Sequence, residues 1–332
     1  GNYKFSTITA SLTGLVIRGA GSGATTLSTT TTGGTAITLS GDGTGLEGVT
    51  VDVIGVAVTP QTSVIASGAR PVIRDVVFTD WFRGLQVSGL NATIEQVQFD
   101  SAAAGAEFAL KLTGANATAN TVRIGTSVGQ AVANAIYVDA DNVLIRNAFA
   151  LTNGNSTAFY VTSSLNLTLA ESTLYGAGTG VAIDLGASSS GRIVGVLCAA
   201  GANAIRTAGV SPYPTTIESC RVGEGGVSGD TILHAGSSTL SLIDCDVTPG
   251  GAGDAGVHIT SADSVLRWHG GALLAPDPFN LADYGVLVDG GAATPVLSDV
   301  VIDAPSVYGV AALSGGMWNW RSATSFAAKA YS

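Results

Sequence analysis

A short pattern of apolar residues recurs about every 25 residues along this chain, and a repeat of that period restricts the fold more than any other feature. Each copy has an apolar residue, two turn-forming residues, an apolar-x-apolar segment, a variable loop, a second apolar-x-apolar segment and usually a glycine. Repeats of roughly 20 to 50 residues are typical of stacked coils, in which each coil buries its apolar face only against its neighbours. The clearest copies are Ile73–Phe78, Ile94–Phe99, Leu169–Leu174, Ile217–Val222 and Leu242–Val247.

The spacing of apolar residues inside each copy indicates strands. The second and third segments alternate with period two, as in Leu85–Val87 and Leu110–Leu112, and this alternation is typical of a β-strand. Between the first and second segments lie two polar residues, such as Arg74 and Asp75. Two residues are too few for a helix and suit a sharp bend. Each coil is therefore predicted to contain three short strands.

Strands in such coils can satisfy their backbone groups only by pairing in parallel with the coils on either side. We therefore predict an all-β fold, a single-stranded parallel β-helix of about 11 coils with a step of ~4.8 Å. A leucine-rich solenoid is the nearest alternative, but its repeat is absent from the sequence. We expect one β-helix domain over residues 1–316, and an aromatic tail over residues 317–332 that caps the last coil or contacts a neighbouring subunit.

The composition limits the classes of function. Glycine contributes 45 of the 332 residues and charged residues only 11%, which favours tight turns and thin strands over helices. Because the formal net charge is −10 and no basic patch is visible, we do not expect binding to nucleic acid. No segment approaches the ~18 uninterrupted apolar residues of a membrane span, so we expect no membrane insertion. The chain opens at Gly1 within a strand-like segment, and we interpret it as part of a longer protein.

Three cysteines, Cys198, Cys220 and Cys245, fall in consecutive coils. Cys220 and Cys245 are predicted to occupy one slot, which would place their Cα atoms ~4.8 Å apart and within disulfide range. His269 is expected at the same position one coil later. Two alternatives therefore remain for these residues, a disulfide between the two cysteines or a Cys-Cys-His metal site. The same column is predicted to hold Asn147 and Ser172, and no C-x2-C metal spacing is present. The sequence favours a ladder of small core residues, and we expect neither a metal nor a cofactor.

The first residues resemble a known family. Residues 13–23, TGLVIRGAGSG, followed by ATTLS, resemble the early coil of the pectate-lyase-like superfamily, and GNYKFSTITA at residues 1–10 resembles the first strand of bacteriophage tailspike proteins of that superfamily. The resemblance implies a right-handed β-helix and a homotrimer that binds cell-surface polysaccharide, located outside the cell or on the phage tail. It also implies that the polysaccharide is cleaved in many members. Pectate lyases of this fold hold calcium with clustered acidic residues near a basic residue, a cluster that we do not find here, so lyase activity is less expected than hydrolysis.

A hydrolase needs two carboxylates on opposite sides of a glycosidic bond and aromatic rings on which sugars stack. The strand before the glycine turn is predicted to present two outward rows, the first with Tyr137, Tyr160 and Arg206, and the second with Asp139 and Asp184. Two coils separate the two aspartates, about 9.6 Å by the strand step, near the upper end of the roughly 6.5–9.5 Å found in inverting glycosidases. We predict Asp184 and Asp139 as the catalytic pair of an inverting endo-glycosidase.

Loop lengths predict a notch over this strand. The loops after Leu174 and Cys198 are short, and longer polar loops flank them. Glu224 or Asp230 is an alternate for Asp139 as the second carboxylate. Because side chains one or two coils apart are always about 5 or 10 Å apart, an ordinary solvent-exposed surface is the competing interpretation. The predicted floor holds Asp184 and Arg206 beside the sugar-binding Tyr137 and Tyr160, and the predicted walls carry Asn153, Asn155, Glu224 and Asp230.

Two further patterns bear on structure and assembly. The bend column, which includes Asp75, Gln96, Arg146, Glu171, Ser219, Asp244 and Asp299, is predicted to contain a left-handed residue in each coil, a conformation that Asp and Asn tolerate. Outward apolar residues at Ala182, Leu233, Leu287 and Ala311 indicate a subunit interface, and Trp81 and Phe82 are expected to be exposed.

Two classes of function remain. The first is a tailspike-like virion or surface protein that binds polysaccharide and has the residues for hydrolysis. The second is a non-catalytic structural or adhesive β-helix in a fibre or surface assembly. Binding of an oligosaccharide over Asp184 and Arg206 would distinguish them.

Overall fold

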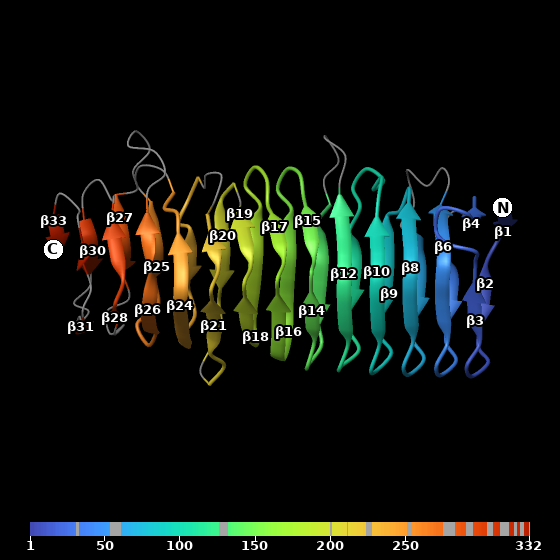
Figure 1. The fold of residues 1–332 in the computed structure, drawn as a ribbon, viewed down its shortest axis with the longest axis horizontal. Helices are drawn as coiled ribbons and strands as arrows, with labels where there is room; N and C mark the ends of the chain where they lie inside the picture. Colours follow the sequence, from blue (N-terminus) through green and yellow to red (C-terminus); the bar gives the residue numbers. More distant parts are fainter. Residues whose placement is uncertain are drawn as a thin grey trace. The chain divides into compact units, whose positions relative to one another are not determined.

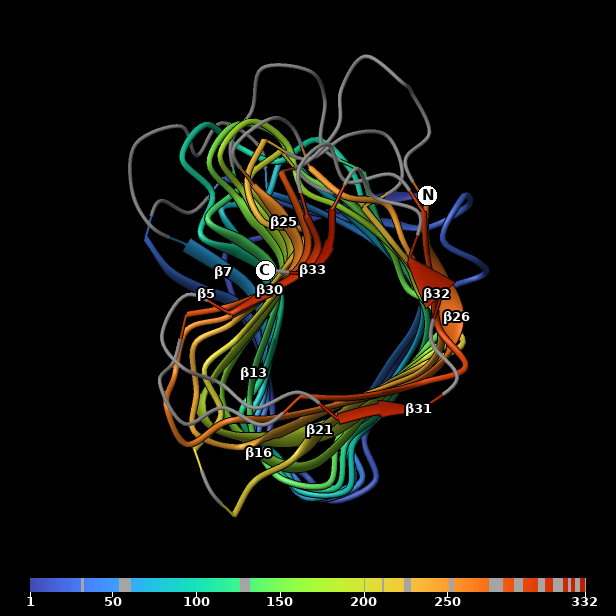
Figure 2. The same cartoon turned by 90° about the vertical axis from the view of Figure 1, so that its left-hand side faces the viewer.

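The computed structural model describes residues 1–30, 33–53, 61–125, 132–199, 201–210, 212–223, 228–250, 254–274, 283–289, 295–303, 308–312, 319–321, 324–325 and 329–331. All of the regular elements in these ranges are β-strands, and no described helix is long and apolar enough to cross a membrane. The chain divides into two compact units, Gly1–Tyr160 and Val161–Ser332. Each unit is a stack of coils built from short parallel strands (Figures 1 and 2).

The first unit contains three columns of paired strands. One column runs through β5, β7, β9, β11 and β13, and its register places Val64, Leu85, Leu110 and Ile136 opposite one another. In Figure 2, β5 and β7 lie on the same side of this unit. The strands are β1 (Asn2–Phe5), β2 (Ile8–Ala10), β3 (Val16–Arg18), β4 (Thr26–Thr29), β5 (Gly34–Leu39), β6 (Gly45–Val53), β7 (Gln61–Ala66), β8 (Val72–Thr79), β9 (Arg83–Val87), β10 (Thr93–Phe99), β11 (Phe108–Leu112), β12 (Thr118–Gly125), β13 (Asn134–Asp139), β14 (Leu144–Arg146) and β15 (Phe149–Leu151).

The second unit repeats the same arrangement. Ile193, Ile217, Leu242, Trp268 and Leu297 lie opposite one another in successive strands. The strand β16 (Thr157–Ala170) contains the boundary between the units. The others are β17 (Thr173–Tyr175), β18 (Val181–Val194), β19 (Leu197–Ala199), β20 (Asn203–Thr207), β21 (Thr215–Glu218), β22 (Arg221–Val222), β23 (Ile232–His234), β24 (Thr239–Val247), β25 (Ala255–Ile259), β26 (Val265–Leu274), β27 (Tyr284–Val288), β28 (Val296–Ser298), β29 (Val301–Asp303), β30 (Tyr308–Ala312), β31 (Asn319–Arg321), β32 (Thr324–Ser325) and β33 (Lys329–Tyr331).

The predicted fold class is confirmed as an all-β parallel β-solenoid of about 11 coils with about 25 residues each. Strands β31, β32 and β33 pair in parallel with β28, β29 and β30 of the preceding coil. The predicted boundary between residues 316 and 317 stays a prediction, and Met317 and Trp318 lie outside the described residues.

The bend between the first two segments uses a left-handed residue in successive coils, as predicted. In the first unit Asp75, Gln96 and Thr121 have φ values of 51°, 55° and 58°. Because a single left-handed residue turns the side chains without breaking the ladder, β8, β10 and β12 each continue through the bend. The prediction was wrong at Arg146, because Asn147 is the left-handed residue there, with a φ of 53°. The second unit has the same feature at Glu171, Ser219, Asp244 and Asp299.

A second turn of the first unit carries a ladder of asparagines. Asn91, Asn116 and Asn142 have φ values of 57°, 60° and 56°. The side-chain amide of Asn116 donates to Asn91 Oδ1 at 3.1 Å, and that of Asn142 donates to Asn116 Oδ1 at 3.1 Å. Asparagine tolerates the left-handed region because its short amide bonds locally, and here the amide also joins successive coils.

Glycines at the end of the third strand stack against one another. A Cβ atom added to Gly68 would lie 2.0 Å from the carbonyl oxygen of Gly41, and one added to Gly89 would lie 1.8 Å from that of Gly68. A Cβ on Gly114 would lie 2.1 Å from the Gly89 oxygen. Contacts this short are impossible, so the close approach of the coils at this corner requires glycine.

The interior is apolar, with aromatic stacking in the first unit. The rings of Phe78 and Phe99 are parallel at 4.7 Å, and Trp81 packs edge-on against Phe99 at 5.8 Å. Trp81 is fully buried, so the expectation that it is exposed was wrong.

The expected apolar interface row in the second unit is also largely buried. Ala182, Leu287 and Ala311 have exposed fractions of 0%, 7% and 0%, and Leu287 and Ala311 pack in a small cluster with Ala255. These three residues are therefore part of the packing within the chain and give no evidence for a subunit interface.

Candidate functional site

The first unit presents an aromatic row on its outer face. Gln86, Lys111 and Tyr137 lie opposite one another on β9, β11 and β13. The rings of Tyr137 and Tyr160 are 5.5 Å apart and inclined by 56°, and Lys111 Nζ lies 4.8 Å from the centre of the Tyr137 ring. All four side chains are half-buried. The structure thus brings together the two tyrosines that the sequence predicts, and adds a cation on one of them. We call Lys111, Tyr137 and Tyr160 the tyrosine row.

The other predicted residues of this unit lie in two places. Asp139 is exposed at the end of β13. Asn153 is half-buried and Asn155 exposed in the connection from β15 to β16, where the Ser156 hydroxyl donates to the Asn153 carbonyl at 2.6 Å. Their roles in catalysis and sugar binding stay predictions.

In the second unit Asp184 and Arg206 form a bidentate ion pair. Arg206 Nε donates to Asp184 Oδ1 at 2.9 Å, and its Nη2 donates to Asp184 Oδ2. The Asp184 side chain is 7% exposed and that of Arg206 47% exposed, so the guanidinium covers the carboxylate. The prediction placed Asp184 in the second outward row, but the register sets it directly opposite Arg206 in the first. Planar bidentate pairing of this kind fixes the geometry of both groups.

A carboxylate and histidine pair lies further along the same unit. Asp230 Oδ2 accepts a hydrogen bond from His258 Nδ1 at 2.6 Å, and Oδ1 accepts from the Ala255 amide at 2.8 Å. Among the described residues, His258 Nε2 is buried without a hydrogen-bond partner. Burial raises the pKa of Asp254, and the negative charges of Asp230 and Asp283 raise it further. A raised pKa favours the protonated form of Asp254, which is the form that a general acid needs.

Asp254 and the contact between Asp230 and His258 were not predicted as features of the site. Asp230 was only an alternate, and Asp254 lies just before β25, outside the apolar-x-apolar pattern of the strands. Glu224, the other alternate, lies outside the described residues. Within the described ranges no group of three or more His, Cys, Asp or Glu side chains is arranged to bind a metal.

The three cysteines are free thiols buried in the core of the second unit, as the small-residue ladder predicts. Burial raises the pKa of Cys198. A hydrogen bond between Cys220 and Cys245 lowers the pKa of Cys220 and raises that of Cys245. The predicted place of His269 beside them was wrong, because His269 pairs with Ile243 and Gly271 pairs with Cys245.

The prediction that Asn147 shares the column of Cys220 and Cys245 was also wrong. It is an exposed bend residue, and its side-chain amide donates to Asn120 Oδ1 at 2.9 Å. Ser172, by contrast, is buried as predicted.

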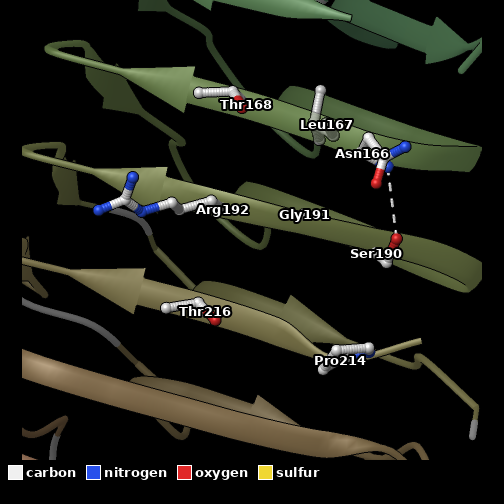
Figure 3. A pocket seen from close by; sticks show the side chains of 8 residues that line it. All are labelled: Asn166, Leu167, Thr168, Ser190, Gly191, Arg192, Pro214 and Thr216. Carbon is white, nitrogen blue, oxygen red and sulfur yellow. Dashed lines mark hydrogen bonds between the residues drawn. The ribbon is translucent and has the colours of Figure 1, made fainter. Parts of the chain in front are cut away.

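Two hollows open on another side of the second unit. The first, of about 380 Å³, is drawn in Figure 3 and is lined by Asn166, Leu167, Thr168, Ser190, Gly191, Arg192, Pro214 and Thr216. The second, of about 350 Å³, is lined by Pro212, Pro214, Ser237, Thr239, Asp263 and Val265. Pro214 belongs to both. None of these residues was predicted as a site residue, since polar residues on an outward strand face do not reveal a depression in that face.

No protein-family model matches the chain, and no curated protein sequence matches it either. Several solved structures, by contrast, match the fold of the chain. The catalytic domain of a GH87 α-1,3-glucanase mutant in complex with nigerose aligns at a TM-score of 0.50 and 10% identity, over 96% of this chain and 62% of the glucanase. A mutant tailspike protein of the E. coli bacteriophage HK620 in complex with a pentasaccharide aligns at 0.50 and 10%, over 91% and 59%. The Dettilon tailspike protein aligns at 0.49 and 12%, over 96% and 61%.

These similarities establish a shared fold. The chain resembles phage tailspikes and the glucanase in being a parallel β-helix, at low sequence identity. The chain spans about 60% of the length of each of these proteins: 62% of the glucanase, 59% of the HK620 tailspike and 61% of the Dettilon tailspike.

Proposed function

We propose that this chain is the polysaccharide-binding β-solenoid of a tailspike-like virion or surface protein that acts outside the cell or on a phage tail. The observation that carries the proposal is the tyrosine row. Half-exposed rings 5.5 Å apart, with an ammonium group above one of them, provide apolar faces for the C–H surfaces of sugar rings and a donor for their hydroxyls. The glucanase and tailspike structures of the same fold hold oligosaccharides, which supports this class of ligand.

Loss of both rings is expected to weaken binding. The double variant Tyr137→Ala/Tyr160→Ala should bind the recognised polysaccharide about tenfold or more weakly, equivalent to about 1.4 kcal/mol, because the stacking surface is removed. Calorimetric titration with a panel of bacterial surface polysaccharides measures this change. Tyr3→Ala is the matched control, since Tyr3 is a 61% exposed tyrosine in the same unit.

Two results would contradict the proposal. If the wild type and the double variant bind with equal affinity, the tyrosine row is not the binding surface. Absence of binding to every polymer by the wild-type chain would favour the alternative, a non-catalytic structural or adhesive solenoid of a fibre or surface assembly.

Hydrolysis of the bound polymer is a second candidate function, favoured by one observation. Burial and the neighbouring charge of Asp230 raise the pKa of Asp254, and a raised pKa is what the general acid of a two-carboxylate hydrolase needs. This assignment competes with the predicted pair of Asp184 and Asp139, in which Asp184 is held by Arg206.

If the chain is a glycosidase that uses Asp254 as its acid, Asp254→Asn should lower the rate of reducing-end release about a hundredfold or more, as expected on loss of a general acid. Asp139→Asn is the matched test of the competing pair and should leave the rate unchanged. If Asp139→Asn lowers the rate and Asp254→Asn does not, the catalytic pair is Asp139 and Asp184. No release by the wild type from any polymer that it binds would end the hydrolytic proposal and leave the binding proposal standing.

A homotrimer remains part of the proposal, by analogy with tailspikes. Among the described residues, the large apolar side chains exposed to solvent include Leu12, Leu15 and Leu90 in the first unit and Leu274 and Val301 in the second, and we propose that such residues contact the other subunits. Sedimentation equilibrium of the wild-type chain is the direct check.

A further inference from the structure

We propose that the two hollows of the second unit form one groove that binds a neutral oligosaccharide, separate in its residues from the tyrosine row. This inference rests on the proposed function, because it takes carbohydrate as the ligand. It goes beyond that function by assigning a second site, its residues and the charge of the sugars that it accepts.

The groove follows the direction in which the coils stack. The first hollow draws on β16, β18, β21 and the connection into β21. The second draws on that connection, on β24 and β26, and on the residues just before these two strands. Pro214 lines both, so the two hollows adjoin. From β16 to β26 there are four strand steps, about 19 Å at ~4.8 Å each. A depression of this length suits a short stretch of a linear polymer lying across the coils.

The chemistry of the lining is that of a sugar site. Polar groups come from the hydroxyls of Thr168, Ser190, Thr216, Ser237 and Thr239 and from the carboxamide of Asn166. Neutral hydroxyls and amides both donate and accept hydrogen bonds, and so do sugar hydroxyls. Pro214, which Figure 3 shows in the lining of the first hollow, also lines the second, and its ring offers an apolar surface for the C–H face of a sugar ring. Volumes of 380 and 350 Å³ are within the range of small-molecule sites.

The charges of the groove favour a neutral ligand. Arg192 is paired with Glu218, with its Nε 3.0 Å from Glu218 Oε2, so its positive charge is already compensated. The second hollow contributes Asp263, which is negative. The whole chain carries a net charge of −10. An acidic polysaccharide would therefore meet repulsion without an unpaired cation in the groove lining to attract it.

The corner behind the groove is held by buried hydrogen bonds. The Thr207 hydroxyl donates to His234 Nδ1 at 2.5 Å, and His234 Nε2 donates to the Ser238 carbonyl at 3.0 Å. Burial lowers the pKa of His234, so the imidazole is neutral at pH 7 and can accept at one nitrogen while donating at the other. A fixed corner keeps the strands that line the groove in place, which reduces the entropy lost when a ligand binds.

The test compares the wild-type chain with three variants on an array of neutral and acidic oligosaccharides. Thr216→Trp/Thr239→Trp places a large side chain in each hollow and should lower affinity for neutral oligosaccharides by tenfold or more. Thr173→Trp makes the same substitution on β17, outside the groove, and should have no effect. Glu218→Gln frees the guanidinium of Arg192 and should increase affinity for uronate-containing oligosaccharides about tenfold, with little change for neutral ones.

The outcomes separate the two proposals. If Thr216→Trp/Thr239→Trp binds every neutral oligosaccharide like the wild type, while Tyr137→Ala/Tyr160→Ala has lost binding, the groove is not a site and the proposed function stands. If the wild type prefers acidic oligosaccharides, the assignment of a neutral ligand is overturned. If the wild type binds no oligosaccharide, both proposals fail. Circular dichroism of each variant must match the wild type for a loss of binding to count.

Discussion

Gly89→Ala is expected to destabilise the first unit by about 3 kcal/mol, at the upper end of the cost of overpacking. The new methyl group would lie 1.8 Å from the carbonyl oxygen of Gly68, a backbone atom that cannot rotate away. The coils would have to separate at this corner, and separation would weaken the parallel hydrogen bonds between β7 and β9. Urea unfolding followed by circular dichroism measures the free energy of unfolding.

Gly23→Ala is the matched control for this substitution. Gly23 lies in the same unit, and an added Cβ has no heavy atom within 4 Å. Its substitution should change the free energy of unfolding by no more than about 0.5 kcal/mol. Equal stabilities of the two variants would show that the coils can move apart at Gly89 without cost, in contradiction to the close packing described for this corner.

Arg206→Ala is expected to destabilise the second unit by about 3 kcal/mol, because it leaves the carboxylate of Asp184 buried without its partner. The Asp184 side chain is only 7% exposed, so water can do little to replace the guanidinium. Asp184→Asn should cost less, about 1 kcal/mol, since Arg206 is 47% exposed and remains hydrated when its partner is neutral. Thermal and urea unfolding of both variants measures the difference.

The double variant Asp184→Leu/Arg206→Leu is the control for this asymmetry. Replacing both charges with apolar groups should restore much of the stability that Arg206→Ala loses, because no unpaired charge is left in a buried position. A loss on Arg206→Ala no greater than that on Asp184→Asn would mean that Asp184 is hydrated in solution. The two charges would then form an ordinary surface ion pair worth about 1 kcal/mol or less.

Much of the fold was predictable because each coil repeats the same local chemistry. Alternating apolar residues such as Leu85 and Val87 assign the strands and their inward faces without reference to the rest of the chain. A polar pair such as Arg74 and Asp75 marks the bend, where the second residue is left-handed in the structure.

The errors in the candidate site have a common physical origin. Asp184 was predicted one side-chain position along from Arg206, and His269 was predicted opposite Cys245 in place of Gly271. Each is a shift of two residues along a strand. A one-residue shift turns every side chain to the other face and is visible in the apolar pattern, whereas a shift of two residues leaves both faces unchanged. The variable loops set this part of the register, and the pattern within a strand does not report it.

The sequence by itself determined the period of the coils, the strand segments, the presence of a left-handed bend and most of the residues that face inward, because all of these depend on neighbours within one copy of the repeat. Only the tertiary structure decided which polar side chains from different coils meet. The pairing of Asp184 with Arg206, the contact of Asp230 with His258 and the hollow beside Pro214 each join residues more than 20 positions apart. Their positions follow from loop lengths and from the stacking of one coil on the next, and these are properties of the assembled solenoid.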